Sequence, residues 1–376
     1  NMPSSTFACL PPPRARRPML LHPVPARLVR AAGLALVSLL AVAAASAPTA
    51  RAQDGPGFSS MVEDDLLPTL LEHADTHFRA LRGDLLGAQG ADIVFVSGAT
   101  EAAALALAGR GLHGAAIEHD AVRAWVREDL AVDAAGQVAV SDPASSTLQL
   151  ANSETGILQD LPEGLAVSDW TQAFGKIPVA FDWSGVEIAF VSAHKIGGPK
   201  GIGALIVKRG LDLEARIRGG GQEMGRRAGT ENLIGIAGFA AAARAATQDL
   251  AAGVWDRVDK LRNILEKTMD PHANGTIFVG KENLRLPNTS LMVTPGWKGE
   301  TQVMQMDLAG FAVSAGSACS SGKVKSSGVL RAMGFSEAEA ASALRVSLGP
   351  ETTEAEVMAF AEAWALARDR WASRGR

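Results

Sequence analysis

The feature that most constrains the fold of this chain is an alternation of short apolar runs with helical stretches, which begins at Asp92. Short apolar runs bounded by turn residues are typical of buried strands. These runs lie at Ile93–Val96, Ala115–Ile117, Thr147–Leu150, Leu165–Val167, Ile188–Val191 and Gly203–Val207. Strands that alternate with helices form a mostly parallel sheet with both faces covered. The sequence therefore predicts an α/β protein.

The pattern changes near Ala252, after a long Ala-rich helix predicted over Glu231–Leu250. We interpret the change as the start of a smaller α+β domain. The residues before Asp92 also differ in character from the body of the chain. The predicted division is a signal-like or disordered segment over 1–53, an extra helix over 54–83, a large domain over 84–251 and a small C-terminal domain over 252–376.

The N-terminal segment contains the pattern of a secretory signal. Arg27 and Arg30 precede the uncharged run Ala31–Ala50, which ends in the small-residue site Ala50-Arg51-Ala52. A basic region, an apolar region and such a site are the parts of a cleavable signal. The run is also just long enough to cross a membrane, so an anchor is the alternative. Export through 27–52 is thus one hypothesis for this chain.

Composition excludes several classes of protein. With 36 Lys and Arg against 40 Asp and Glu, the chain lacks the excess positive charge of a general nucleic-acid binder. Its two cysteines, Cys9 and Cys319, exclude a disulfide framework and a cysteine-rich metal domain. His73, Asp75 and His77 fall on a predicted helix, but no fourth ligand lies near them in the sequence. We therefore predict no metal site.

Three segments place polar groups at the ends of predicted strands. Ser97-Gly98-Ala99-Thr100 lies between a strand and a helix, where free N–H groups bind phosphate or a Thr simply caps the helix. Asp169 follows Leu165–Val167, at the edge where open α/β sheets bind ligands, although a helix cap is the alternative. Lys195 follows a buried strand, so its amine either extends to solvent or is a desolvated nucleophile.

Two further residues suggest chemistry in the C-terminal part. Cys319 lies in Ser314-Ala315-Gly316-Ser317-Ala318-Cys319-Ser320-Ser321-Gly322, among small residues on both sides. Such surroundings predict an exposed loop whose thiol can ionise and act as a nucleophile. Arg345 stands alone in an apolar stretch, and bidentate binding of a carboxylate is the characteristic use of such an arginine.

Three long motifs occur in a fixed order: SAHKIGGPKGIGAL, GGGQEMGRRAGTEN and SAGSACSSG. With these motifs the chain resembles the cysteine desulfurases of the NifS/IscS type, within the class V aminotransferases, from about Ala91 to about Thr353. The resemblance implies the PLP-dependent transferase fold type I, which is aspartate aminotransferase-like. That fold has a large domain with a mostly parallel sheet and a small α+β C-terminal domain. The implied reaction converts L-cysteine to L-alanine and leaves a persulfide on Cys319.

The resemblance also implies pyridoxal 5'-phosphate as the cofactor. Lys195 would bind it covalently and later move the substrate α-proton, and Asp169 would pair with the ring nitrogen. His119 would stack on the ring and serve in proton transfer. The other cofactor contacts would come from Ala99, Thr100, Ser192 and His194 at the phosphate, Gln172 at the phenolic oxygen, Ser153, and Thr230 at the phosphate of the partner subunit.

Substrate binding is implied for Arg345, which would hold the cysteine carboxylate, while Cys319 would attack the sulfur. The family's asparagine beside the cofactor falls on Ser153 here, so its contact either persists through serine or passes to Asn152. The role of Thr230 implies a homodimer. A sulfur-acceptor protein, such as an iron–sulfur scaffold, is the expected further partner, and no direct nucleic-acid partner is expected.

Besides Ser153, one further departure from the family pattern bears on these expectations. The family normally begins with a strand that carries an Asp-x-x-Ala-Thr-Thr-like motif, which we do not find before Asp92. Our hypothesis is a desulfurase-like body joined to a foreign N-terminus. The chemistry predicts a cytoplasmic location, in conflict with the signal-like segment. The alternative functions are a related PLP-dependent aminotransferase, a selenocysteine lyase, or a catalytically impaired relic. An aminotransferase would not need the loop that presents Cys319.

Overall fold

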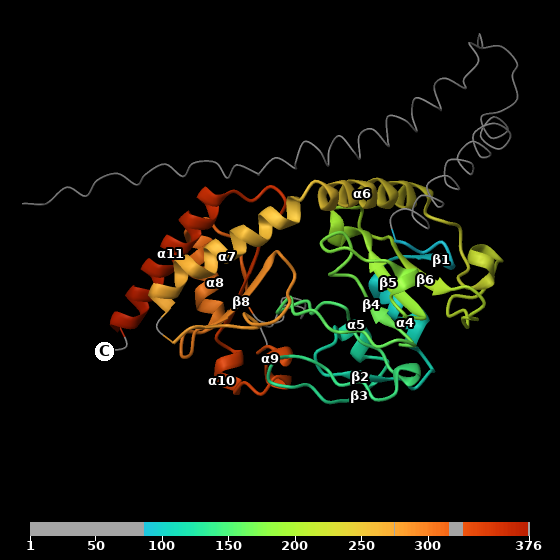
Figure 1. Ribbon diagram of the computed structural model, residues 1–376, viewed down its shortest axis with the longest axis horizontal. Coiled ribbons are helices and arrows are strands. Elements are labelled where there is room, and N and C mark those ends of the chain that lie inside the picture. Colours follow the sequence, from blue (N-terminus) through green and yellow to red (C-terminus); the bar gives the residue numbers. More distant parts are fainter. Residues whose placement is uncertain (1–85, 274, 316–325, 375–376) are drawn as a thin grey trace, which may run out of the picture.

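The computed structural model describes residues 86–273, 275–315 and 326–374. The predictions for 1–53 and 54–83 fall outside these residues, and so does Cys319. Figure 1 shows two groups of elements side by side, one built from the first part of the described chain and one from the last. No helix within the described ranges is both long and apolar enough to cross a membrane.

The first group is built on a four-stranded sheet. Its strands in spatial order are β1 (Ala91–Val96), β6 (Gly203–Lys208), β5 (Ile188–Ser192) and β4 (Ser168–Asp169). β6 runs antiparallel to both of its neighbours, whereas β5 and β4 are parallel.

Parallel bridges continue this sheet beyond β4. Thr147 bridges to Val167, and Ser146 bridges to His113. His113 begins the parallel strand pair β2 (His113–Ala115) and β3 (Arg127–Leu130). All of these links are parallel, so β6 is the antiparallel exception in a mostly parallel arrangement. The sequence prediction of such a sheet is confirmed.

Helices cover both faces of the sheet, α4 (Ala99–Leu107) on one side and α6 (Leu233–Ala251) on the other (Figure 1). Alternate side chains of β1 show why its sequence is apolar throughout. Val94 and Val96 pack with residues of α4, whereas Ile93 and Phe95 pack with Phe239 of α6. Successive side chains of a strand point to opposite faces, and here both faces are buried.

The first group also contains short helical turns. They are α5 (Asp120–Arg123), η3 (Pro143–Ser145), η4 (Phe181–Trp183), η5 (Ala193–Ile196) and η6 (Gln222–Gly225).

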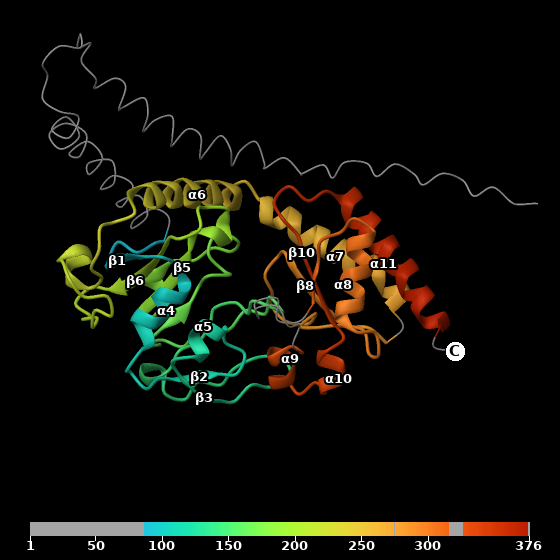
Figure 2. The ribbon, with the colours of Figure 1, turned by 180° about the vertical axis from the view of Figure 1, so that it is seen from behind.

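The second group is an antiparallel sheet packed against long helices. Its strands in spatial order are β7 (Ile277–Phe278), β8 (Thr289–Val293), β10 (Ala343–Ser347) and β9 (Ser314–Ala315). Its helices are α7 (Val254–Ala273), α8 (Gly299–Leu308), α9 (Gly328–Ala332), α10 (Glu337–Ala340) and α11 (Glu354–Arg374). Figure 2 shows α7, α8 and α11 grouped beside the sheet. Trp297 and Trp364 are fully buried in the core between these elements. The α+β character agrees with the prediction, while the domain limits 84–251 and 252–376 stay a prediction.

Some local predictions differ from the structure. Of the predicted strand Thr147–Leu150, only Thr147 is in a bridge. The helix predicted over Glu231–Leu250 begins later than predicted, because α6 starts at Leu233 and Asn232 caps it by accepting from the N–H of Gly235 at 3.0 Å.

Candidate functional site

The turn between β1 and α4 presents a helix N-terminus at the end of a buried strand. Gly98 is the N-cap of α4, with φ 155°, and no side chain caps this helix. The first N–H groups of the helix, at Ala99 and Thr100, therefore have no hydrogen-bond acceptor within the helix. A Cβ on Gly203 of β6 would lie 2.9 Å from the Cα of Gly98. Only glycine at 203 therefore lets this turn lie against the sheet. Such a terminus can bind an anion.

The end of β5 lies beside this turn. Ser192 is buried, and its Oγ lies 2.9 Å from Nδ1 of His194 and 3.6 Å from the position of a Cβ on Gly98. Burial lowers the pKa of His194, and the positive charges of Lys195 and Lys200 lower it further. The structure thus brings together the four predicted phosphate contacts, Ala99, Thr100, Ser192 and His194. Lys195 lies in η5 with an exposed side chain.

Asp169 is the last residue of β4, one strand away from Lys195. Its Oδ1 accepts from the N–H of Thr171 at 2.8 Å. Burial raises the pKa of the Asp169 carboxyl, whereas the bonds from Thr171 and the charges of His119 and Lys195 act in the opposite direction. The carboxyl is therefore in the same electrostatic neighbourhood as His119 and Lys195. A half-buried carboxylate of this kind fits a protonated ring nitrogen.

His119 forms the N-cap of α5, a role that fixes its ring. Its Nδ1 accepts from the N–H of Ala121 at 3.1 Å. In the neutral ring the proton is therefore on Nε2, the nitrogen left for a ligand.

The preceding residue, Glu118, was missed by the sequence reasoning. Burial raises the pKa of its carboxyl to about 8, and the charge of Asp169 adds to this. Oε1 accepts from the N–H of Gln149 at 2.9 Å, while Oε2 is buried without a hydrogen-bond partner among the described residues. The only signal in the sequence is an acidic residue directly after the apolar run Ala115–Ile117.

Gln172 lies on the turn that follows Asp169, and a buried lysine contacts it. Lys176 Nζ donates to the backbone carbonyl of Gln172 at 2.8 Å and to its Oε1 at 2.9 Å. The sequence reasoning also missed Lys176. Its signal is a lysine inside the otherwise apolar segment Ala173–Ile177.

Arg345 of β10 joins the second group of elements to the first. Its Nη1 donates to the carbonyl of Ser153 at 2.9 Å, and its Nε is buried without a partner among the described residues. Asn152 is fully buried, with Nδ2 donating to Ile117 and Oδ1 accepting from the N–H groups of Glu154 and Thr155. These bonds hold the loop against which Arg345 is positioned.

Glu154, in the same loop, is buried beside this arginine. Burial raises the pKa of its carboxyl, whereas a hydrogen bond from Ser327 Oγ and the charge of Arg345 lower it. Arg345 is thus a guanidinium held at the junction of the two groups, and its residue type can bind a carboxylate.

Thr230 is set apart from the other predicted residues. It is exposed, and among the described residues it makes no contact with Lys195 or Asp169. Ion pairs anchor the segment before it, from Arg226 to Asp92 at 3.0 Å and from Arg227 to Glu101 at 2.8 Å. Its predicted contact with a partner subunit stays a prediction.

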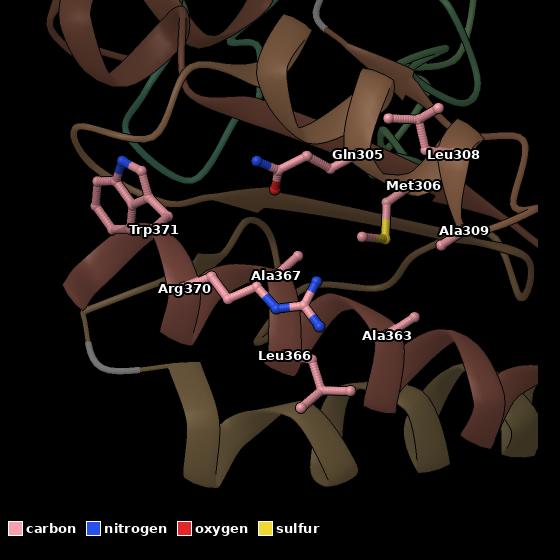
Figure 3. A pocket seen from close by; sticks show the side chains of 9 residues that line it. All are labelled: Gln305, Met306, Leu308, Ala309, Ala363, Leu366, Ala367, Arg370 and Trp371. Atoms are coloured by element: carbon pink, nitrogen blue, oxygen red, sulfur yellow. The ribbon is translucent and has the colours of Figure 1, made fainter. Parts of the chain in front are cut away.

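A pocket of about 400 Å³ lies elsewhere, between α8 and α11 (Figure 3). It is lined by Gln305, Met306, Leu308, Ala309, Ala363, Leu366, Ala367, Arg370 and Trp371. None of the predicted site residues lines it. The candidate site is therefore the edge of the first sheet and not this pocket.

Comparisons with known proteins agree with this geometry. The family "Aminotransferase class-V" matches residues 129–360. A cysteine desulfurase of Frankia sp. is 40% identical over 327 residues, covering 74% of this chain and 77% of the relative. One from Gluconacetobacter diazotrophicus is 37% identical over 309 residues, covering 73% and 77%.

A solved structure, the NifS-like protein of Rickettsia africae, superimposes with a TM-score of 0.74 at 27% identity, covering 89% of this chain and 96% of that one. The predicted fold type I and the predicted enzyme class are confirmed. Members of this family use pyridoxal phosphate. The chain therefore belongs to the cysteine desulfurase family of class-V aminotransferases.

Proposed function

We propose that this protein takes sulfur from L-cysteine, releases L-alanine and carries the sulfur as a persulfide on Cys319, with pyridoxal 5'-phosphate as its cofactor. The observation that carries the proposal is the grouping of three residues that follow three different strands: His119 after β2, Asp169 at the end of β4 and Lys195 after β5. These are the residue types that such a cofactor needs around its ring.

The residues present fit this cofactor. The half-buried Asp169 would hold the ring nitrogen, and Gln172 would lie at the phenolic oxygen, with Ser153 nearby. The phosphate would take the helix N-terminus at Ala99 and Thr100, together with Ser192 and His194. When bound, the cofactor supplies an electron sink for the charge that develops at the substrate α-carbon.

The chain's own groups would then perform distinct tasks. The amine of Lys195 would hold the cofactor covalently and later accept the α-proton. His119, with Nδ1 occupied by Ala121, would exchange a proton through Nε2. Arg345 would bind the cysteine carboxylate through its guanidinium, with its bond to the Ser153 carbonyl in the Asn152 loop fixing its position.

Sulfur transfer would use the thiolate of Cys319. The thiolate would attack the substrate sulfur, so that an S–S bond forms and the C–S bond of the substrate breaks. The electron pair of the broken C–S bond would pass to the carbon, which takes up a proton to give alanine. The persulfide would pass its outer sulfur to an acceptor, such as an iron–sulfur scaffold. A homodimer in which Thr230 reaches the partner's cofactor phosphate belongs to the same proposal. A cytoplasmic location remains our prediction, because the expected acceptors are there.

The test measures alanine and sulfide released from cysteine with a thiol reductant, together with the visible absorbance of the bound cofactor. Lys195→Ala should lose the covalent cofactor, whereas Cys319→Ser should keep the absorbance and lose sulfide release. Borohydride reduction and peptide mass mapping should place the label on Lys195. Sulfide release that survives Cys319→Ser at the parent rate, or a label on another residue, would overturn the proposal.

A further inference from the structure

Lys176 is a buried lysine close to the candidate site that none of the tasks above requires. It is 8% exposed and lies at the end of a tight turn in which the N–H of Lys176 donates to Ala173 at 3.0 Å. Gly175 within the turn has φ 76°, and a Cβ there would lie 2.8 Å from Cγ2 of Ile196. The turn therefore packs directly beneath the residue that follows Lys195.

The charge of Lys176 has no acidic partner in the part of the chain that the structure describes. Both hydrogen-bond acceptors of its Nζ are oxygens of Gln172. The nearest charges that act on it are those of Lys195 and Arg345, and both are positive. Burial, with a smaller contribution from these charges, lowers the pKa of Lys176 to about 7. A buried amine without a counter-ion is destabilising, so packing alone does not account for a lysine here.

The contacts of Lys176 decide which way the Gln172 amide faces. A glutamine amide has an acceptor oxygen and a donor nitrogen, and a lysine amine in either protonation state can donate to the oxygen. With Oε1 taken by Lys176 at 2.9 Å, the nitrogen Nε2 is the end left free. In the described residues no hydrogen bond of this nitrogen is recorded. The amide is thus held with its donor nitrogen left for a ligand.

We propose that Lys176 is a positioning residue that holds the Gln172 amide so that its Nε2 donates to the phenolic oxygen of the cofactor. This inference rests on the proposed function, because it places Gln172 beside the cofactor. A donor at that oxygen stabilises its deprotonated form. Without Lys176 the amide can rotate and present either end, so the donor is no longer assured.

The readout is the pH midpoint of the visible absorbance band of the cofactor-loaded, full-length protein. Lys176→Met keeps the length of the side chain and removes both hydrogen bonds. We expect the midpoint to rise by about one pH unit, as for the loss of one hydrogen bond to a charged group. An unchanged midpoint would refute the inference.

Gln172→Ala provides the matched control that separates positioning from a direct effect of charge. This variant should raise the midpoint by a similar amount. If Lys176 acts through the amide, adding Lys176→Met to Gln172→Ala should cause no further rise. A full further rise in the double variant would mean that the lysine acts through space, and the inference would be wrong.

A third variant keeps the test informative if Lys176→Met does not fold. Lys176→Arg retains N–H donors, so positioning predicts a midpoint close to that of the parent. A rise as large as that of Gln172→Ala would contradict it. A parent protein that binds no cofactor would count against the proposed function itself, whereas a loaded parent with an unchanged Lys176→Met midpoint would refute only the role of Lys176.

Discussion

Two buried sets of charged groups in this molecule differ in how completely they are paired. In the second group of elements, Glu266 and Arg285 have side chains 4% and 3% exposed, and they form a double hydrogen bond at 2.9 and 3.0 Å. Ser290 Oγ also donates to Glu266 at 2.7 Å. At the edge of the first sheet, the buried Glu118 and the half-buried Asp169 act on each other electrostatically, and among the described residues neither accepts a hydrogen bond from an arginine or a lysine.

The difference separates a structural use of charge from a functional one. A carboxylate that accepts from an arginine and a hydroxyl is satisfied within the chain, and it needs no ligand. Carboxyl groups with raised pKa values, close to an exposed lysine at strand ends, are typical of sites that bind a charged partner. The contrast predicts that substitutions of the paired Glu266 and Arg285 change stability. Substitutions of Glu118 and Asp169 should instead change cofactor binding or the pH dependence of stability.

The largest effect is expected at the paired set. Glu266→Gln leaves the buried guanidinium of Arg285 without its counter-charge, which should lower the free energy of unfolding by about 3–5 kcal/mol. Urea denaturation measures this loss. The double variant Glu266→Leu with Arg285→Met should recover most of it, because no unpaired charge remains. A small effect of Glu266→Gln alone would weaken the contrast between the two sets.

An intermediate effect is expected at Glu118, and it depends on pH. The pKa of its carboxyl is raised from 4.5 to about 8 in the folded protein, so between these values the folded state holds a proton that the unfolded state has lost. Stability from this group is therefore fully present below pH 4.5 and is lost as the pH rises toward 8.

Glu118→Gln should remove this pH-dependent loss of stability. From pH 5 to pH 8, the free energy of unfolding of the parent should therefore fall by about 3 kcal/mol relative to that of the variant. Urea denaturation of the cofactor-free proteins at several pH values measures the difference. Parallel curves for the two proteins would show that Glu118 is not held protonated.

The smallest effect is expected for Asp169→Asn, and it should concern binding more than stability. The amide keeps the shape but cannot carry a negative charge toward the ring nitrogen. Cofactor binding should weaken by about 2 kcal/mol, the scale of a hydrogen bond between charged groups. Titration of the cofactor-free protein by absorbance measures this change. The unfolding free energy of the cofactor-free variant should not fall, and a clear fall would assign Asp169 to the structural set.

Much of the fold could be predicted because its signals are local. Strands buried on both faces must be apolar throughout, so runs such as Ile93–Val96 and Ile188–Val191 were visible. The strand-to-helix turn at Gly98 could be predicted because its signal, too, lies in neighbouring residues. The start of α6 was misplaced at Glu231, because several residues there can precede a helix and only the backbone path selects Asn232 as the cap.

The sequence by itself determined the class of fold, the family and the identity of the reactive groups, because periodicity and motif order are properties of neighbouring residues. Only the tertiary structure decided which charges meet. Arg345 reaches Ser153 across 192 positions of sequence, and Glu118 lies beside Asp169 because the strand ends converge. Burial and pairing depend on what the folded chain places around a group, and these alone distinguish the satisfied Glu266 from the unsatisfied Glu118.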